Sequence, residues 1–214
     1  MLRQIAVELK RHAPFTLLGA VTGVVIMALL VVLAVPSDAA AVVFYVLHPV
    51  HVVTSALATT SMYRTHGGGK LWAAALIGYT GSIGIATVSD TVIPYLGGFL
   101  LGAEMEFHVP FLETAPMPVL GAPKCLIVNS CAVLGIVVGC LRPATRFPHA
   151  GHVLLSTWAS LFSFAAFGVA DWLPLLAPLF VFLFLAVWLP CCASDIVFPL
   201  LWTSDDAKGR DGSP

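Results

Sequence analysis

Charge is scarce in this sequence. Only 10% of its 214 residues are Asp, Glu, Lys or Arg, and the formal net charge is −1. That balance excludes a bulk electrostatic attraction to nucleic acid. No polar stretch is long enough for a soluble domain, and the N-terminus is too polar to be the core of a secretory signal peptide.

Apolar residues dominate instead. Hydrophobic residues make up 59% of the chain, and the mean hydropathy is +0.96. Several apolar runs reach about 20 residues, the length at which a helix crosses ~30 Å of hydrocarbon. We therefore expect one all-α, polytopic membrane domain over residues 1–214. Six transmembrane helices are predicted, at residues 15–34, 39–62, 71–100, 118–141, 147–169 and 174–202.

The basic residues are distributed unevenly between these spans. All ten Lys and Arg residues except Lys124 fall on one side of the predicted membrane. The 101–117 loop on the other side contains Glu104, Glu106 and Glu113. Because Lys and Arg are enriched in cytoplasmic segments, we predict a plasma (inner) membrane protein with both termini in the cytoplasm.

One polar pattern occurs twice. It consists of His-x-x-His, a Ser four residues later and, in the next span, Ser-Asp-x-x-x-Pro. The first copy contains His48, His51, Ser55, Ser89, Asp90 and Pro94, and the second contains His149, His152, Ser156, Ser194, Asp195 and Pro199. Since each copy covers three spans, the halves must insert with opposite orientations. We predict a 3+3 inverted-topology repeat, with repeat 1 at residues 13–103 and repeat 2 at residues 116–203, as is typical of transporters.

Histidine and aspartate are costly at membrane depth, so their duplication indicates a functional site. Each His pair lies on one helix face. Each Pro lacks the N–H that would bond the carbonyl of the Asp four residues earlier, so the Asp offers a carboxylate and a freed carbonyl oxygen. Imidazole and carboxylate together suit Mn(II), Zn(II) or Fe(II). The predicted metal ligands are His48, His51, Asp90, His149, His152 and Asp195, supported by the Ser and Pro residues of the motif.

The five cysteines form no Cys-x-x-Cys motif. Cys191 and Cys192 align with Ala86 and Thr87 in the first repeat, so the repeat did not retain thiols. They are predicted to be small apolar residues. A vicinal soft-metal pair is the alternative.

The stretch Ser89-Asp90-Thr-Val-Ile-Pro94 resembles the Ser-Asp-x-x-Ile-Pro stretch of manganese or heavy-metal permeases of the ten-span type. This resemblance covers about six residues and implies a metal-handling permease. The whole chain is also similar to an uncharacterised family of small prokaryotic integral membrane proteins that contain His-Pro-x-His and Ser-Asp-x-x-x-Pro motifs.

Three function classes remain open. The leading prediction is a permease that moves Mn, Zn or Fe through a His/Asp site between the repeats. Proton coupling is natural for such a site, because protons compete with metal for His. The alternatives are an intramembrane metal-dependent hydrolase and a non-catalytic membrane assembly subunit. A near-symmetric ligand set favours a transporter over an enzyme. The expected partners are the lipid bilayer and a metal ion, and the small size makes a homodimer plausible.

Overall fold

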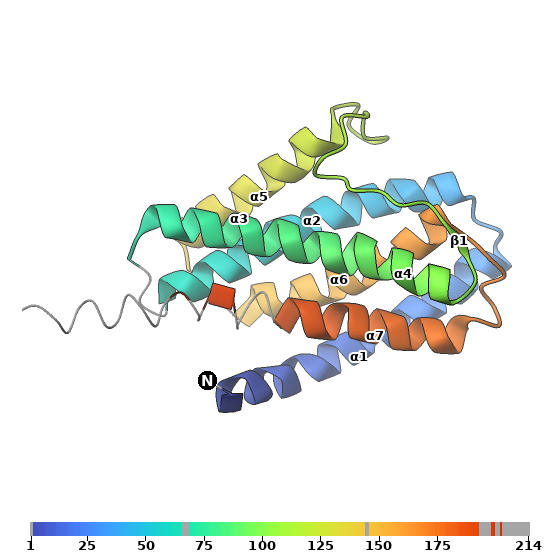
Figure 1. The fold of residues 1–214 in the computed structure, drawn as a ribbon, viewed down its shortest axis with the longest axis horizontal. Coiled ribbons are helices and arrows are strands. Elements are labelled where there is room, and N and C mark those ends of the chain that lie inside the picture. Colours follow the sequence, from blue (N-terminus) through green and yellow to red (C-terminus); the bar gives the residue numbers. More distant parts are fainter. Residues whose placement is uncertain (1, 66–68, 144–145, 193–197, 200–201, 203–214) are drawn as a thin grey trace, which may run out of the picture.

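In the computed structural model, the regular secondary structure of the described residues is helical apart from two short strands (Figure 1). The described residues are 2–65, 69–143, 146–192, 198–199 and 202. Only the backbone is described for residues 2–9, 11–12, 146–150 and 192. The helices are α1 (Leu2–Val32), α2 (Ser37–Thr65), α3 (Leu71–Thr87), α4 (Ile93–Leu100), α5 (Lys124–Leu141), α6 (Arg146–Phe167) and α7 (Leu176–Cys192). A π-helical turn, η1 (Val88–Val92), joins α3 and α4 into one continuous helix, so the predicted all-helical fold with six helices is confirmed.

The helices follow one long axis and alternate in direction (Figure 1). The central helices α2 and α6 pack against each other. The outer helix α1 packs on α6 and α7, while α5 packs on α2 and α3. Exchanging α1, α2 and α3 for α5, α6 and α7 therefore preserves these pairings. The pattern agrees with a three-plus-three repeat, and the superposition of the two halves stays a prediction.

The polarity of the surface is reversed relative to that of a soluble protein. Exposed large apolar side chains follow α1 and α5, among them Val25, Leu29, Leu126 and Leu134. Serine, threonine, histidine and aspartate side chains are buried instead. Four helices, covering Ala13–Val32, Ser37–Thr65, Leu71–Leu100 and Lys124–Leu141, are long and apolar enough to cross a membrane. Shorter apolar helices cover Gly151–Phe167 and Leu176–Cys191. These features are those of a membrane protein.

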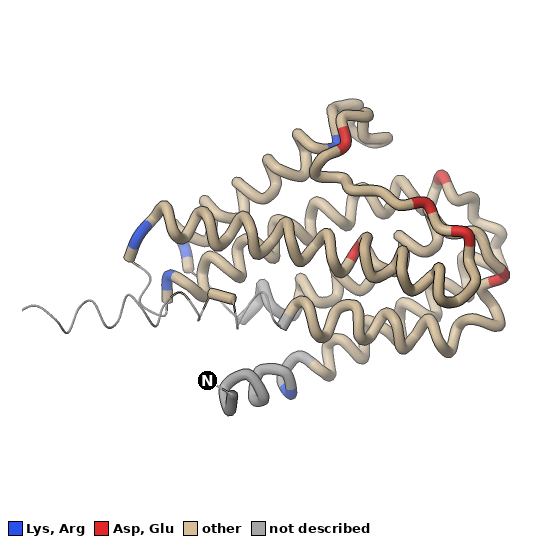
Figure 2. The backbone as a smooth tube through the Cα atoms, in the orientation of Figure 1, with Lys and Arg blue, Asp and Glu red and all other residues tan. Residues whose placement is uncertain are grey.

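Charge is segregated between the two ends of the bundle (Figure 2). Arg64 lies in the last turn of α2, Lys70 immediately precedes α3, and Arg142 caps the C-terminus of α5, all at one end. The described acidic side chains gather mainly at the other end, in the first turn of α2 and in the 101–123 segment, together with Lys124. The described residues thus reproduce the asymmetry read from the sequence.

The 101–123 segment differs from the prediction. A helix was expected from residue 118, but α5 begins at Lys124. Pro116 and Pro123 lie in an isolated β-bridge, and Gly121 has a positive φ of 66°, so this stretch forms a turn. Earlier in the segment, β1 (Glu104–Met105) pairs antiparallel with β2 (Gly168–Val169). This pairing ties the end of α4 to the connection between α6 and α7.

The first and last helices also differ from the predicted spans. Helix α1 begins well before residue 15 and includes Pro14. The predicted span 174–202 corresponds to α7 as far as Cys192. Residues 193–197, 200–201 and 203–214 lie outside the described residues.

Candidate functional site

Asp90 lies at the centre of a buried polar cluster. Its Oδ2 atom accepts hydrogen bonds from Nδ1 of His48 at 2.9 Å and Nδ1 of His51 at 2.8 Å. Its Oδ1 atom accepts from Oγ of Ser89 at 2.7 Å and lies 3.2 Å from Oγ of Ser156. These five side chains are 0–1% exposed. Because an ionised carboxylate only accepts, each Nδ1 donates to it. The Ser156 hydroxyl also lies 3.2 Å from Oγ of Ser89, so its one proton has two available acceptors.

The π turn places this carboxylate between α2 and α6. In a π turn the amide at position i bonds the carbonyl at i−5, as Ile93 does with Val88. Pro94, which has no N–H, is therefore opposite the carbonyl of Ser89. That carbonyl accepts a hydrogen bond of 2.8 Å from the Ser160 hydroxyl of α6. The sequence had assigned the freed carbonyl to Asp90, and the π turn shifts it by one residue.

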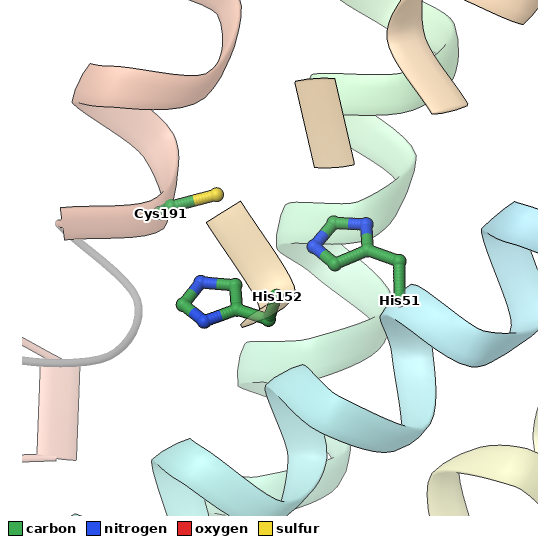
Figure 3. A group of neighbouring side chains, drawn as sticks. All are labelled: His51, His152 and Cys191. Atoms are coloured by element: carbon green, nitrogen blue, oxygen red, sulfur yellow. The ribbon is translucent and has the colours of Figure 1, made fainter. Parts of the chain in front are cut away.

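A second group of ligand-type atoms lies on the far side of His51. The His51 and His152 rings are stacked, with centroids 5.9 Å apart and planes inclined by 6°. One ligand atom each from His51, His152 and Cys191 lies within 4.8 Å of the other two (Figure 3). Nε2 of His51 has no hydrogen-bond partner among the described residues. The Cys191 thiol donates to Oγ of Ser156 over 3.7 Å, which joins this group to the Asp90 cluster.

The structure brings together much of the predicted site. His48, His51, Asp90 and His152 lie in one buried region, together with Ser89 and Ser156. Their roles as metal ligands stay predictions.

For the other predicted site residues, the structure describes no hydrogen bond to Asp90. Ser55 is buried on α2, and its hydroxyl has no described hydrogen-bond partner. Pro94 lies in α4, and Pro199 is buried. The backbone of His149 lies in α6, but its side chain is outside the described part of the chain, as are Ser194 and Asp195.

The sequence predicted Cys191 as a metal ligand only in the alternative of a soft-metal pair with Cys192. The comparison of repeats led to its interpretation as a small apolar residue, because the first repeat has no thiol at the matching place. Its position four residues before Asp195 was the available signal, since residues four apart share a helix face. In the structure its side chain is buried and belongs to a cluster with Val153 of α6 and with Ala186 and Val187 of its own helix, α7.

A cavity of about 410 Å³ lies at the acidic end of the bundle. Its lining includes Glu106, His108 and Glu113. Phe44 connects this region to the cluster: its ring stacks on His48 with centroids 5.3 Å apart and meets His108 edge-on at 5.0 Å. Burial of His108 lowers its pKa to about 4, because removal from water disfavours the charged imidazolium.

No protein-family model matches this chain, and no curated protein or solved structure is significantly similar to it. The fold and the site therefore define its class alone. It is an all-helical protein whose apolar helices are compatible with a membrane, with a buried candidate metal-binding group of histidine and cysteine.

Proposed function

We propose that the protein is a membrane permease for a divalent transition-metal cation, with Mn, Zn and Fe as the candidate ions. The observation that carries this proposal is the buried convergence of His48, His51 and Asp90 with His152. Helices of both halves contribute to it, the arrangement in which transporters built from repeats bind their substrate.

Charge supports a cationic substrate. With neutral imidazoles, the cluster carries the single negative charge of Asp90 in an environment from which water is excluded. A buried charge is costly unless it is paired. A cation compensates it, and protonation of the histidines provides the competing state, which makes metal/proton exchange the natural coupling.

The acidic end of the bundle supports a route to the cluster. Glu106 and Glu113 line the cavity there, and carboxylates concentrate cations near an opening. Phe44 lies between the cavity residue His108 and the cluster residue His48. We infer that cations approach from this side and that the Phe44 ring must move to admit them.

The distribution of basic residues supports an orientation of the protein in the membrane. The basic end of the bundle contains Arg64, Lys70 and Arg142, which by the positive-inside rule face the cytoplasm. With six membrane-spanning helices, we infer that both termini lie inside and that the cavity opens to the opposite side.

An intramembrane metal-dependent hydrolase is the second candidate. A near-symmetric ligand set argued against it, but the surroundings of the histidines differ. His51 bonds to Asp90, whereas His152 faces His51 and Cys191. Unlike neighbours of this kind are what acid–base chemistry at a metal requires.

Purified protein in sealed vesicles tests the proposal. Uptake of Mn(II), Zn(II) or Fe(II) should exceed that of empty vesicles, and the same ion, rather than Mg(II) or Ca(II), should raise the melting temperature in detergent. Asp90→Asn should weaken both effects. Asp38→Asn, at an exposed position in the first turn of α2, is the matched control and should retain them. A melting temperature indifferent to all three ions contradicts a metal site. Binding without uptake favours the hydrolase.

A further inference from the structure

We propose that the ion is held by one thiolate and two imidazoles, from Cys191, His51 and His152, and that Asp90 positions His51 instead of binding the metal. This inference rests on the proposed metal-handling function and narrows its substrate to ions that favour nitrogen and sulfur, Zn(II) above all. Ions with a preference for oxygen, such as Mn(II), are disfavoured by such a set.

Hydrogen bonds occupy most of the acceptor sites of Asp90 and therefore disfavour it as a metal ligand. His48, His51 and Ser89 donate to it, and the Ser156 hydroxyl lies 3.2 Å away. The bond from His51 fixes the ring so that Nδ1 carries the hydrogen and the Nε2 lone pair is available. Metal-binding histidines usually have this arrangement, with one nitrogen on the ion and the other donating to a carboxylate.

The free nitrogen of His51 borders the other two ligand groups. Its Nε2 is buried and has no described hydrogen-bond partner, which is costly unless an ion or water completes it. The candidate ligand atoms of the three residues lie within 4.8 Å of one another, from three different helices (Figure 3). Ligand atoms around a tetrahedral zinc are about 3.3–3.6 Å apart. Binding therefore needs the side chains to approach by about one ångström.

Charge balance selects a divalent ion. Coordination releases the Cys191 proton, because the thiolate is the ligand form. The thiolate and the Asp90 carboxylate then carry two negative charges, which one divalent cation neutralises within the water-excluded interior. Three protein ligands leave a fourth position open, and an ion in transit needs such a position to gain and lose its last water.

Cobalt(II) is the spectroscopic probe for this site. The full-length protein, purified under reducing conditions in detergent, should bind one equivalent and develop a thiolate-to-cobalt charge-transfer band in the near ultraviolet. Cys191→Ser should lose the band and weaken cobalt binding at least tenfold. Cys131→Ser is the matched control, because Cys131 packs against the separate apolar cluster around Val128 and Ala132. It should keep both the band and the affinity.

Asp90→Asn separates positioning from ligation. The band should remain, while affinity falls by about 10- to 100-fold, as is usual when the partner of a metal-binding histidine is changed. X-ray absorption of the zinc-loaded parent protein needs no variant. It should show one sulfur at about 2.3 Å together with nitrogen at about 2.0–2.1 Å.

Three results overturn the inference. A zinc shell of nitrogen and oxygen alone, or a charge-transfer band that survives in Cys191→Ser, contradicts thiolate ligation and leaves the proposed permease intact. Absence of cobalt and zinc binding in the parent protein contradicts this inference, and absence of any response to Mn(II), Zn(II) and Fe(II) contradicts the metal permease as well.

Discussion

Helices α2 and α6 contain the same polar pattern but form different contacts with it. On α2, His48 and His51 both donate to Asp90, while the Ser55 hydroxyl has no described partner. On α6, the serines make the contacts: Ser156 reaches Oδ1 of Asp90, and Ser160 donates to the carbonyl of Ser89. The described parts of both helices therefore contact Ser89 and Asp90, in the π turn of the first half.

A repeated motif therefore does not predict which contacts its side chains form. Helical spacing fixes which side chains share a face, but the partner on the opposite helix decides what each one does. The tripeptide Leu-Gly-Ala also occurs once in each half, at residues 18–20 and 120–122. Its glycines lie in different structures: Gly19 lies inside α1 against Thr157, whereas Gly121 lies in a turn with a φ of 66°.

Removal of the Asp90 carboxylate, which both helices contact, should have the largest effect on stability. Asp90→Ala leaves buried N–H and O–H donors from both helices without their acceptor. We expect a loss of about 3–5 kcal/mol in the free energy of unfolding, the usual cost of breaking a buried charged network. Denaturant unfolding in detergent measures it, with exposed Asp38→Ala as the control. A loss below about 1 kcal/mol would mean that the α2 and α6 contacts do not depend on Asp90.

A pH effect is expected on the α2 side, where Phe44 separates His108 from His48. The pKa of His108 is about 4 in the folded protein, below the ordinary value of 6.5. Between these values the unfolded chain binds the extra proton, so stability must rise with pH through this window and fall as the pH drops below about 6.5. Since one pKa unit is about 1.4 kcal/mol, the shift from 6.5 to about 4 corresponds to roughly 3–4 kcal/mol.

His108→Gln isolates that contribution from other acid-sensitive groups. Subtracting the stability curve of the variant from that of the parent between pH 4 and 7 should leave a difference with the stated slope. A flat difference curve would show that the pKa of His108 is not lowered and that water reaches its imidazole in the folded protein.

The outer helices allow a third test, because α5 packs on α2 as α1 packs on α6. A Cβ added at Gly135 of α5 would meet the backbone carbonyl oxygen of Val53 on α2. A Cβ at Gly19 of α1 would lie 2.7 Å from Oγ1 of Thr157, a side-chain atom that can turn away. We expect Gly135→Ala to cost about 2–3 kcal/mol and Gly19→Ala about 1 kcal/mol. Equal costs would show that both helix pairs can separate equally well.

Much of the fold followed from local properties of the sequence. Apolar run length predicted all six helices, and spacing predicted that His48, His51 and Ser156 would share a buried region with Asp90. The start of α5 was predicted too early, because hydropathy does not register the turn around Gly121.

The remainder depended on contacts between distant elements. The π turn shifted the freed carbonyl from Asp90 to Ser89, a choice supported by Ser160 about seventy residues later in the chain. Cys191 joined His51 and His152 only through the packing of three helices. The comparison of the repeats had ranked Cys191 as a small apolar residue, because that comparison assumed that both halves supply the same ligand types.

Removing the hydroxyl of Ser156 or of Ser55, which occupy equivalent positions in the two repeats, should change stability less. Ser156→Ala removes a hydroxyl that lies 3.2 Å from Asp90 and accepts from Cys191, so a loss of about 1 kcal/mol is expected. Ser55→Ala, at the equivalent position of α2, removes a buried hydroxyl without a described partner and should be neutral or slightly stabilising. Thermal melting of the two variants side by side checks this. A reversed order would mean that Ser55 forms the more important contact.

The smallest expected effect concerns how α1 and α5 end. After α1, the amide of Val35 bonds the carbonyl of Leu30 at 2.9 Å and that of Ala34 bonds Val31 at 3.0 Å, which is a Schellman motif. The motif holds Ala34 at a φ of 48°, a left-handed conformation that costs a non-glycine residue about 1 kcal/mol. Helix α5 ends instead at Arg142 with a φ of −135°, where no such strain exists. Ala34→Gly should therefore raise stability by about 0.5 kcal/mol, the strain relieved minus the entropy that glycine loses on folding. Ala39→Gly, five residues later in the first turns of α2, should lower it, because glycine weakens a regular helix. The two variants share one chemical change, and opposite signs in the same melting experiment would establish that the backbone at residue 34, and not the loss of a methyl group, sets the difference.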